Sequence, residues 1–69
     1  MPHSARYHVH RGDHVVSFDG YDLGYVSGVS PAAEWFTVDT RANRIWLPES
    51  DVFSRDGKEV RLSRNASMY

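Results

Sequence analysis

Histidine is the first residue type in this sequence whose spacing suggests chemistry, because imidazole is a common ligand for Zn²⁺ and Ni²⁺. Two of the N-terminal histidines, His8 and His10, would project on the same side of an extended segment. A metal site needs a third ligand, and only Asp13 or a partner chain offers one nearby. The segment also lacks the ligand spacing of known zinc sites. We therefore predict no cofactor and no resident metal, with His8 and His10 as weak candidates in a solvated arm that carries His3, His8, His10 and His14.

Catalytic chemistry is not indicated by the other reactive side chains. The chain has no cysteine, and its serines are not set in a nucleophile-elbow motif. The carboxylate pairs stand in or beside expected turns, where aspartate commonly hydrogen-bonds to the backbone. We predict that the protein is not an enzyme. The carboxylate pairs are Asp19 with Asp22, Glu49 with Asp51, and Asp56 with Glu59.

Two tryptophans are the strongest candidates for a functional site. Trp35 and Trp46 stand in strand-like segments, and the hairpin register derived below directs both away from the aliphatic core. Large exposed aromatic side chains are enriched at protein interfaces, where they bury much area at a modest entropy cost. We predict an interface formed by Trp35 and Trp46, to which Tyr21 and Tyr25 add. An alternative stays open, in which the N-terminal arm or the C-terminal tail folds over both indole rings.

The charge balance bears on the kind of partner. Eight Lys and Arg stand against nine Asp and Glu, a net charge of −1. From Trp35 onward six basic residues accompany five acidic ones, which is a mixed surface rather than a basic footprint. We predict a non-catalytic protein-interaction or self-assembly module whose partner is another protein or a second copy in a homodimer. The alternative, a small β-barrel that binds single-stranded nucleic acid through aromatic and arginine side chains, ranks second.

Short runs of β-branched and aromatic residues must position these side chains. No segment of useful length repeats apolar residues with helical spacing, so a long amphipathic helix is not expected. The runs cover residues 14–18, 23–30, 35–39, 45–47, 52–54 and 58–62. Strands of this length and spacing predict an all-β fold, a small antiparallel β-barrel of about six strands built from hairpins.

Glycines mark the turns and bends of this barrel. A two-residue type I′ loop requires positive φ at both central positions, which Asp tolerates and Gly favours, so each Asp-Gly dipeptide predicts a tight hairpin turn. Glycine inside a strand often marks a bulge or a barrel corner. The structural residues predicted on these grounds are Asp19, Gly20, Gly24, Gly28, Asp56 and Gly57.

The register of two hairpins follows from side-chain alternation. A pairing of Asp39 with Arg44 across a four-residue loop places the aliphatic residues on one face and Trp46 on the other. The same pairing makes an exposed ion pair between Asp39 and Arg44, which stabilises the hairpin by only about a few tenths of a kcal/mol. In the last hairpin, a two-residue loop places Phe53 opposite Val60, both inward. The expected inward set is Val15 or Val16, Leu23, Val26, Val29, Phe36, Val38, Ile45, Leu47, Phe53, Val60 and Leu62.

The length of 69 residues allows a single domain. We expect a flexible N-terminal arm over residues 1–10, the barrel over residues 11–64 and a C-terminal tail over residues 65–69. No apolar stretch reaches the length of a signal peptide or a transmembrane helix, so we expect a cytoplasmic protein without a membrane partner. A chain this small buries only about 60% of its unfolded surface, so self-association would add stability.

Several landmarks together resemble the PRC-barrel superfamily, including its small stand-alone members. The resemblance extends over residues 11–62 and implies a six-stranded barrel used as an interaction module, with no catalytic residues to transfer. Relatives occur in the photosynthetic reaction-centre H subunit and in a ribosome-maturation factor, and neither role is carried over. The landmarks are Gly12, Val15-Val16, Asp19-Gly20, Leu23-Gly24-Tyr25-Val26, Leu47-Pro48, Val52 and Val60-Arg61-Leu62.

Overall fold

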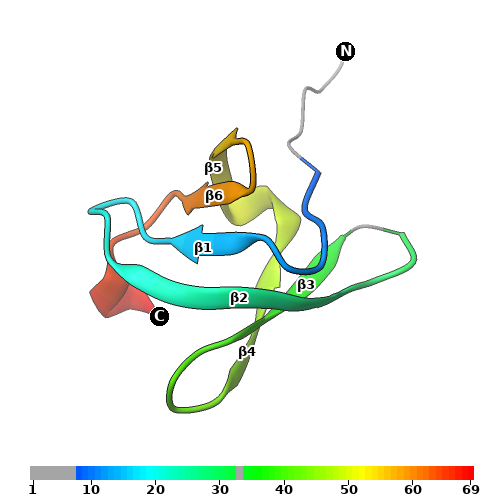
Figure 1. The fold of residues 1–69 in the computed structure, drawn as a ribbon, viewed down its shortest axis with the longest axis horizontal. Helices are drawn as coiled ribbons and strands as arrows, with labels where there is room; N and C mark the ends of the chain where they lie inside the picture. The colour runs from blue at the N-terminus through cyan, green and yellow to red at the C-terminus, as the bar shows by residue number, and fades with distance from the viewer. Residues whose placement is uncertain (1–7, 33) are drawn as a thin grey trace.

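The computed structural model describes residues 8–32 and 34–69, and these form one six-stranded sheet (Figure 1). Its order is β4-β3-β2-β1-β6-β5, and no α-helix occurs in the described part of the chain. The all-β prediction is thus confirmed. The strands are β1 (His14–Val16), β2 (Asp22–Val29), β3 (Trp35–Asp39), β4 (Arg44–Pro48), β5 (Val52–Asp56) and β6 (Glu59–Leu62); the short 3-10 helices are η1 (Glu49–Asp51) and η2 (Ala66–Met68).

The sheet curls into a half-barrel and mixes strand orientations. Four neighbouring pairs are antiparallel, but β1 and β6 run parallel, with Val15 beside Val60. The prediction of an all-antiparallel barrel is therefore wrong. The reason is that β1 lies between β2 and β6, so its second neighbour comes from the far end of the chain. Loop lengths and side-chain alternation predict pairing only between strands that follow one another in the sequence.

The β3–β4 hairpin has the register that alternation predicts. Asp39 pairs with Arg44, Val38 with Ile45, and Thr37 with Trp46. This register turns the aliphatic side chains toward the core and leaves the indole of Trp46 on the opposite face.

The β5–β6 hairpin differs from the prediction. Asp56 pairs with Glu59, so the loop consists of Gly57 and Lys58 rather than Asp56 and Gly57. Gly57 supplies the required positive φ of 62° as the first loop residue. Moving the loop by one residue shifts the pairing by two, so Arg55 rather than Phe53 lies opposite Val60 and the alternation of faces is kept. Phe53, expected to lie inward, is 56% exposed where the ladder is irregular between Val52 and Ser54.

Strand β2 bends at two irregularities, as its glycines predict. The register shifts opposite Leu23 against β1 and at Ser27 against β3, each beside a glycine. Gly24 has a φ of 147°, and a Cβ built on it would lie 2.0 Å from the carbonyl oxygen of Asp39. The backbones of β2 and of the β3 end approach too closely for any other residue. The β1–β2 connection is longer than a two-residue loop, with Ser17 O accepting from Gly20 N at 3.0 Å.

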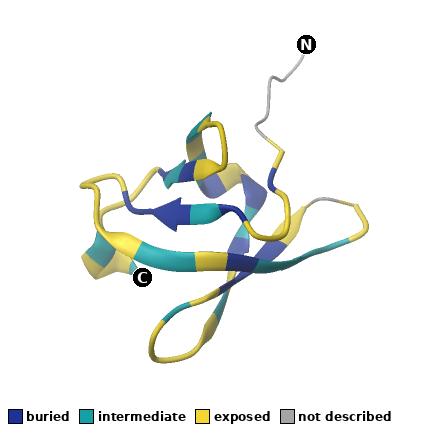
Figure 2. Cartoon of the chain, in the orientation of Figure 1, coloured by how far each residue is buried: buried dark blue, intermediate teal, exposed yellow. Residues whose placement is uncertain are grey.

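The buried residues stand mainly on the strands (Figure 2), and most of the hydrophobic ones form one core cluster. Both Val15 and Val16 are buried, while Leu23, Val29 and Ile45 are partly buried against the core. The sequence did not indicate one member, Val9, which comes from the expected N-terminal arm. The buried hydrophobic residues are Val9, Val15, Val16, Val26, Phe36, Val38, Leu47, Val60 and Leu62.

The C-terminal tail is tied to the domain through Tyr69. Its ring packs against the core, and its hydroxyl donates to Asp51 Oδ2 at 2.9 Å. Nearby, the backbone N–H of Ala66 donates to Asp19 Oδ1 at 3.0 Å. Burial and the Asp51 hydrogen bond raise the pKa of Tyr69 from 10.0 to about 12. The neutral phenol is therefore the form that stabilises the fold.

Replacing Tyr69 with phenylalanine is expected to lower the free energy of unfolding by about 1.5 kcal/mol at neutral pH, since it removes one hydrogen bond to a carboxylate. Because the folded pKa is raised, the wild-type advantage is complete below pH 10 and declines as the pH rises toward 12. Urea unfolding of both proteins between pH 7 and 11.5 measures this difference. A gap that stays constant across that range contradicts the role of the phenol proton.

Candidate functional site

Trp35 and Trp46 lie on the outer face of the sheet, away from the core. Trp35 is 47% exposed and Trp46 is 66% exposed. The alternative that a terminus covers them is not what the described residues do, because Val9 packs in the core and Tyr69 contacts Asp51. Both indoles are therefore accessible on the described part of the molecule.

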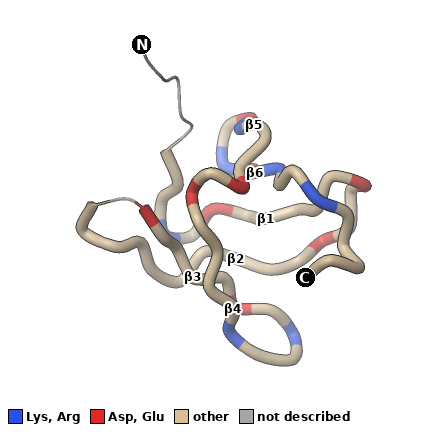
Figure 3. The backbone as a smooth tube through the Cα atoms, turned by 180° about the vertical axis from the view of Figure 1, so that it is seen from behind, with Lys and Arg blue, Asp and Glu red and all other residues tan. Residues whose placement is uncertain are grey.

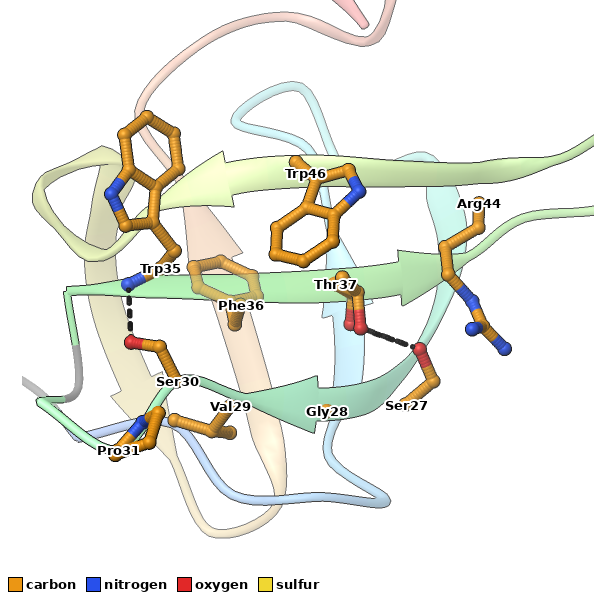
Figure 4. A pocket seen from close by; sticks show the side chains of 10 residues that line it. All are labelled: Ser27, Gly28, Val29, Ser30, Pro31, Trp35, Phe36, Thr37, Arg44 and Trp46. Carbon is orange, nitrogen blue, oxygen red and sulfur yellow. Dashed lines mark hydrogen bonds between the residues drawn. The ribbon is translucent and has the colours of Figure 1, made fainter.

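The two tryptophans line one open groove of about 370 Å³ (Figure 4). Figure 4 shows both rings on the side of β3 and β4, with the end of β2 and Pro31 across from them. Gly28 pairs with Thr37, and its missing side chain leaves this part of the groove open. The lining residues are Ser27, Gly28, Val29, Ser30, Pro31, Trp35, Phe36, Thr37, Arg44 and Trp46.

Hydroxyl groups fix the walls of the groove. Ser30 Oγ accepts from the backbone N–H of Trp35 at 3.2 Å and of Glu34 at 3.1 Å, which holds the start of β3 (Figure 4). Ser27 Oγ and Thr37 Oγ1 lie 2.7 Å apart and share a hydrogen bond across the β2 irregularity. The groove is thus built on paired strands rather than on a free loop, which favours a fixed shape.

An ion pair stands at one end of the groove. Arg44 Nε donates to Asp39 Oδ1 at 2.6 Å, as the hairpin register predicts. The hydrogen bond from Arg44 lowers the pKa of Asp39, and the same bond raises the pKa of Arg44. Both side chains are exposed, so the outer face presents one positive and one negative group side by side.

The two tyrosines of the predicted interface lie in different places. Tyr25 pairs with Asp39, so its side chain lies on the outer face of the sheet, as that of Trp46 does. The Tyr25–Asp39 row is the next one on this face after the Thr37–Trp46 row. Its ring packs on His14, with centroids 5.0 Å apart. Tyr21 is exposed in the β1–β2 connection and does not line the groove. The structure brings together Trp35 and Trp46, with Tyr25 beside them.

The structure has a second exposed aromatic pair, which the sequence did not predict. Phe18 and Phe53 contact edge to face, with ring centroids 5.2 Å apart, and Arg61 Nη1 donates to the carbonyl oxygen of Phe18 at 3.0 Å. Sequence reasoning placed Phe53 inside, so the contact was hidden. The ladder irregularity between Val52 and Ser54, where Phe53 is exposed, has no signal in the sequence.

The histidines do not assemble a metal centre in the part of the chain that is described. There, no three His, Asp or Glu side chains are grouped as ligands. His14 Nε2 lies 2.8 Å from Asp22 Oδ1, and the carboxylate of Asp13 binds Arg55 and the backbone N–H of His10. His8 and His10 are exposed at the chain surface. His3 lies outside the described residues.

The carboxylates near the turns hold the backbone and neighbouring side chains. Asp19 accepts from Ser17 Oγ at 2.5 Å and from the Ala66 amide, and the Ser17 hydrogen bond lowers its pKa below 3.8. Asp51 accepts from Tyr69 and lies 3.7 Å from Arg64. These contacts give Asp19 and Asp51 roles in holding the turns and the C-terminal tail.

Basic and acidic groups are interspersed over the molecule (Figure 3). Four arginines form ion pairs: Arg44 with Asp39, Arg55 with Asp13, Arg61 with Glu59 and Arg64 with Asp51. A nucleic-acid surface would instead leave arginines clustered and available for phosphates. Within the described residues, each of these four arginines lies beside a carboxylate.

Comparisons place no known protein beside this chain: no family model, curated protein or solved structure matches it. Within residues 8–32 and 34–69, no helix is long and apolar enough to cross a membrane.

Proposed function

We propose that this protein is a non-catalytic interaction or self-assembly module that binds another polypeptide through the groove lined by Trp35 and Trp46. The observation that carries the proposal is the exposure of two indoles on one groove, on paired strands of the sheet. Its PRC-barrel character belongs to the same proposal and is supported by the landmarks in the sequence.

The exposed indoles carry enough surface for such binding. Trp46 is 66% exposed, and burying a large apolar side chain is worth roughly 1.5–3 kcal/mol before the cost of association is subtracted. Tryptophan is also the residue type most enriched among interface residues that dominate binding energy. The hydroxyls of Ser27, Ser30 and Thr37 beside the rings give a partner backbone polar contacts at the groove.

Replacing Trp46 with alanine is expected to weaken association by at least about 30-fold, since a central tryptophan contributes roughly 2 kcal/mol or more. Sedimentation velocity over a wide concentration range measures self-association. A displayed library of random peptides, selected on the wild type and counter-selected on the Trp46→Ala variant, measures binding of other polypeptides. Phe53→Ala is the matched control, because Phe53 is also exposed but lies outside the groove.

Equal loss in the Trp46→Ala and Phe53→Ala variants contradicts the groove as the binding site. A wild type that neither self-associates nor selects peptides rejects the proposal as a whole. Salt-dependent binding of single-stranded oligonucleotides that requires Trp46 would favour the nucleic-acid alternative instead.

A further inference from the structure

Strand β4 is one end of the sheet, so one of its edges has no strand beside it. Thr40 N donates to Asn43 O at 2.8 Å, which makes this a hydrogen-bonded pair of the hairpin. Pairs alternate along an antiparallel ladder, so Ile45 and Leu47 bond to β3 while Arg44 and Trp46 direct their N–H and C=O groups outward. Among the described residues, no other element hydrogen-bonds to the backbone of Arg44 or Trp46.

An apolar groove lies on each side of this free edge. The outer groove is the one lined by Trp46. On the inner face, a second groove of about 360 Å³ is lined by Leu23, Ile45 and Tyr69 together with the β3–β4 loop. A strand added to β4 would direct alternate side chains to the two faces, and each face offers it an apolar contact.

We propose that a second copy of this chain supplies that strand, and that two β4 strands pair antiparallel about a two-fold axis through Trp46. In this register Trp46 lies opposite the partner's Trp46, Arg44 opposite the partner's Pro48, and Ile45 opposite the partner's Leu47. The two Trp46 residues then exchange two hydrogen bonds, and each Arg44 N–H donates to a Pro48 carbonyl. The Arg44 carbonyl receives no bond across the seam, because Pro48 has no N–H. The inference rests on the proposed function, because it names the partner of the same surface.

Charge and backbone chemistry support this occupant and this register. Arg44 faces a proline rather than a second arginine, whereas a two-fold axis through Arg44 would oppose like charges, which is destabilising. Pro48 has no N–H, and its ring nitrogen lies on the free edge, where proline is tolerated in sheets. The Asp39–Arg44 pair next to the seam adds one charge of each sign, so two copies meet without net repulsion.

The absence of cysteine makes the register directly testable. Hydrogen-bonded antiparallel residues have Cα atoms about 5.5 Å apart, within the range that a disulfide spans. We expect an equimolar mixture of the Arg44→Cys and Pro48→Cys variants to form a disulfide-linked dimer under mild oxidation. Each variant alone is expected to cross-link at least 10-fold less, because identical positions would lie about 13 Å apart along the seam.

The outcomes separate this inference from the proposed function. Cross-linking in the mixture alone, together with a sedimentation dimer that the Trp46→Lys variant loses, supports the β4 pairing. A dimer that does not cross-link in the mixture overturns the pairing and leaves the Trp35–Trp46 groove as the binding surface. A monomer that still selects peptides through Trp46 overturns the second copy as the partner, while the proposed function stands. If each variant alone cross-links as much as the mixture, the disulfides form by random collision, and this result also overturns the register.

Discussion

Replacing Gly24 with alanine is expected to lower the free energy of unfolding by about 3 kcal/mol or more, enough to unfold much of a domain this small. Two effects add. The φ of 147° is strained for any residue with a Cβ, at a cost of about 1–3 kcal/mol. The new Cβ would also lie 2.0 Å from Asp39 O and 2.9 Å from Asp39 C, so β2 and β3 must separate. Urea unfolding monitored by tryptophan fluorescence measures the loss.

Gly20→Ala is the matched control for Gly24→Ala. Gly20 also has a positive φ, 89°, but a Cβ there would meet nothing within 4 Å. Its replacement should therefore cost only the backbone strain, about 1 kcal/mol. If both variants lose the same stability, the close approach at Gly24 contributes nothing and the argument fails. The comparison also bears on the binding groove, because the same β2–β3 pairing carries Gly28 and Thr37.

Local patterns were enough to predict the β3–β4 hairpin. Alternation between residues 35 and 47 leaves one register that keeps Ile45 inside and Trp46 outside, and the structure has that register. The register of the β5–β6 hairpin was predicted wrongly, because Gly57 can occupy either position of a two-residue turn. Arg55 then takes the place of Phe53 opposite Val60, and Phe53 is exposed at the irregularity between Val52 and Ser54, which no local pattern indicates.

The predicted site was correct in its main residues and incomplete in its shape. Trp35 and Trp46 follow from the register, but the groove also needs the irregularity at Ser27 and the bend after Ser30, which depend on tertiary contacts. The parallel pairing of β1 and β6 joins segments more than forty residues apart and has no local signal. The same distance hides the most buried ion pair in the described chain, between Asp13 and Arg55.

Replacing Asp13 with asparagine is expected to destabilise the fold by about 3 kcal/mol. The Asp13 side chain is 3% exposed, and its two oxygens accept from Arg55 and from the His10 N–H at 2.7 Å. Arg55 also donates to His8 O at 2.9 Å, so the pair fastens the segment that carries Val9 into the core. Breaking a buried pair costs roughly 3–5 kcal/mol. We expect the lower end, because Arg55 is 22% exposed and water can solvate part of the freed charge.

The acid side of the stability curve tests the same pair. Burial opposes ionisation of Asp13, but the hydrogen bonds from Arg55 and from the His10 amide outweigh it and lower its pKa below 3.8. Because the folded pKa lies below the unfolded value of about 3.9, the stabilisation is complete above that value and is lost as the pH falls through the folded pKa. Asp13→Asn should therefore reduce the acid dependence of unfolding below about pH 4, as measured by urea unfolding at several pH values.

Asp39→Asn provides the contrast between a buried and an exposed pair. It breaks the exposed pair with Arg44, which should cost less than about 1 kcal/mol. If Asp13→Asn costs no more than Asp39→Asn, then burial does not strengthen the Asp13–Arg55 pair, and Val9 must be held by its apolar contacts alone. A large loss of unfolding free energy in Asp13→Asn that is the same at low and high salt is instead expected for an ion pair buried away from solvent. Such a result would make residues 8–13 an integral part of the folded domain, because their attachment to β5 would then decide whether the core closes.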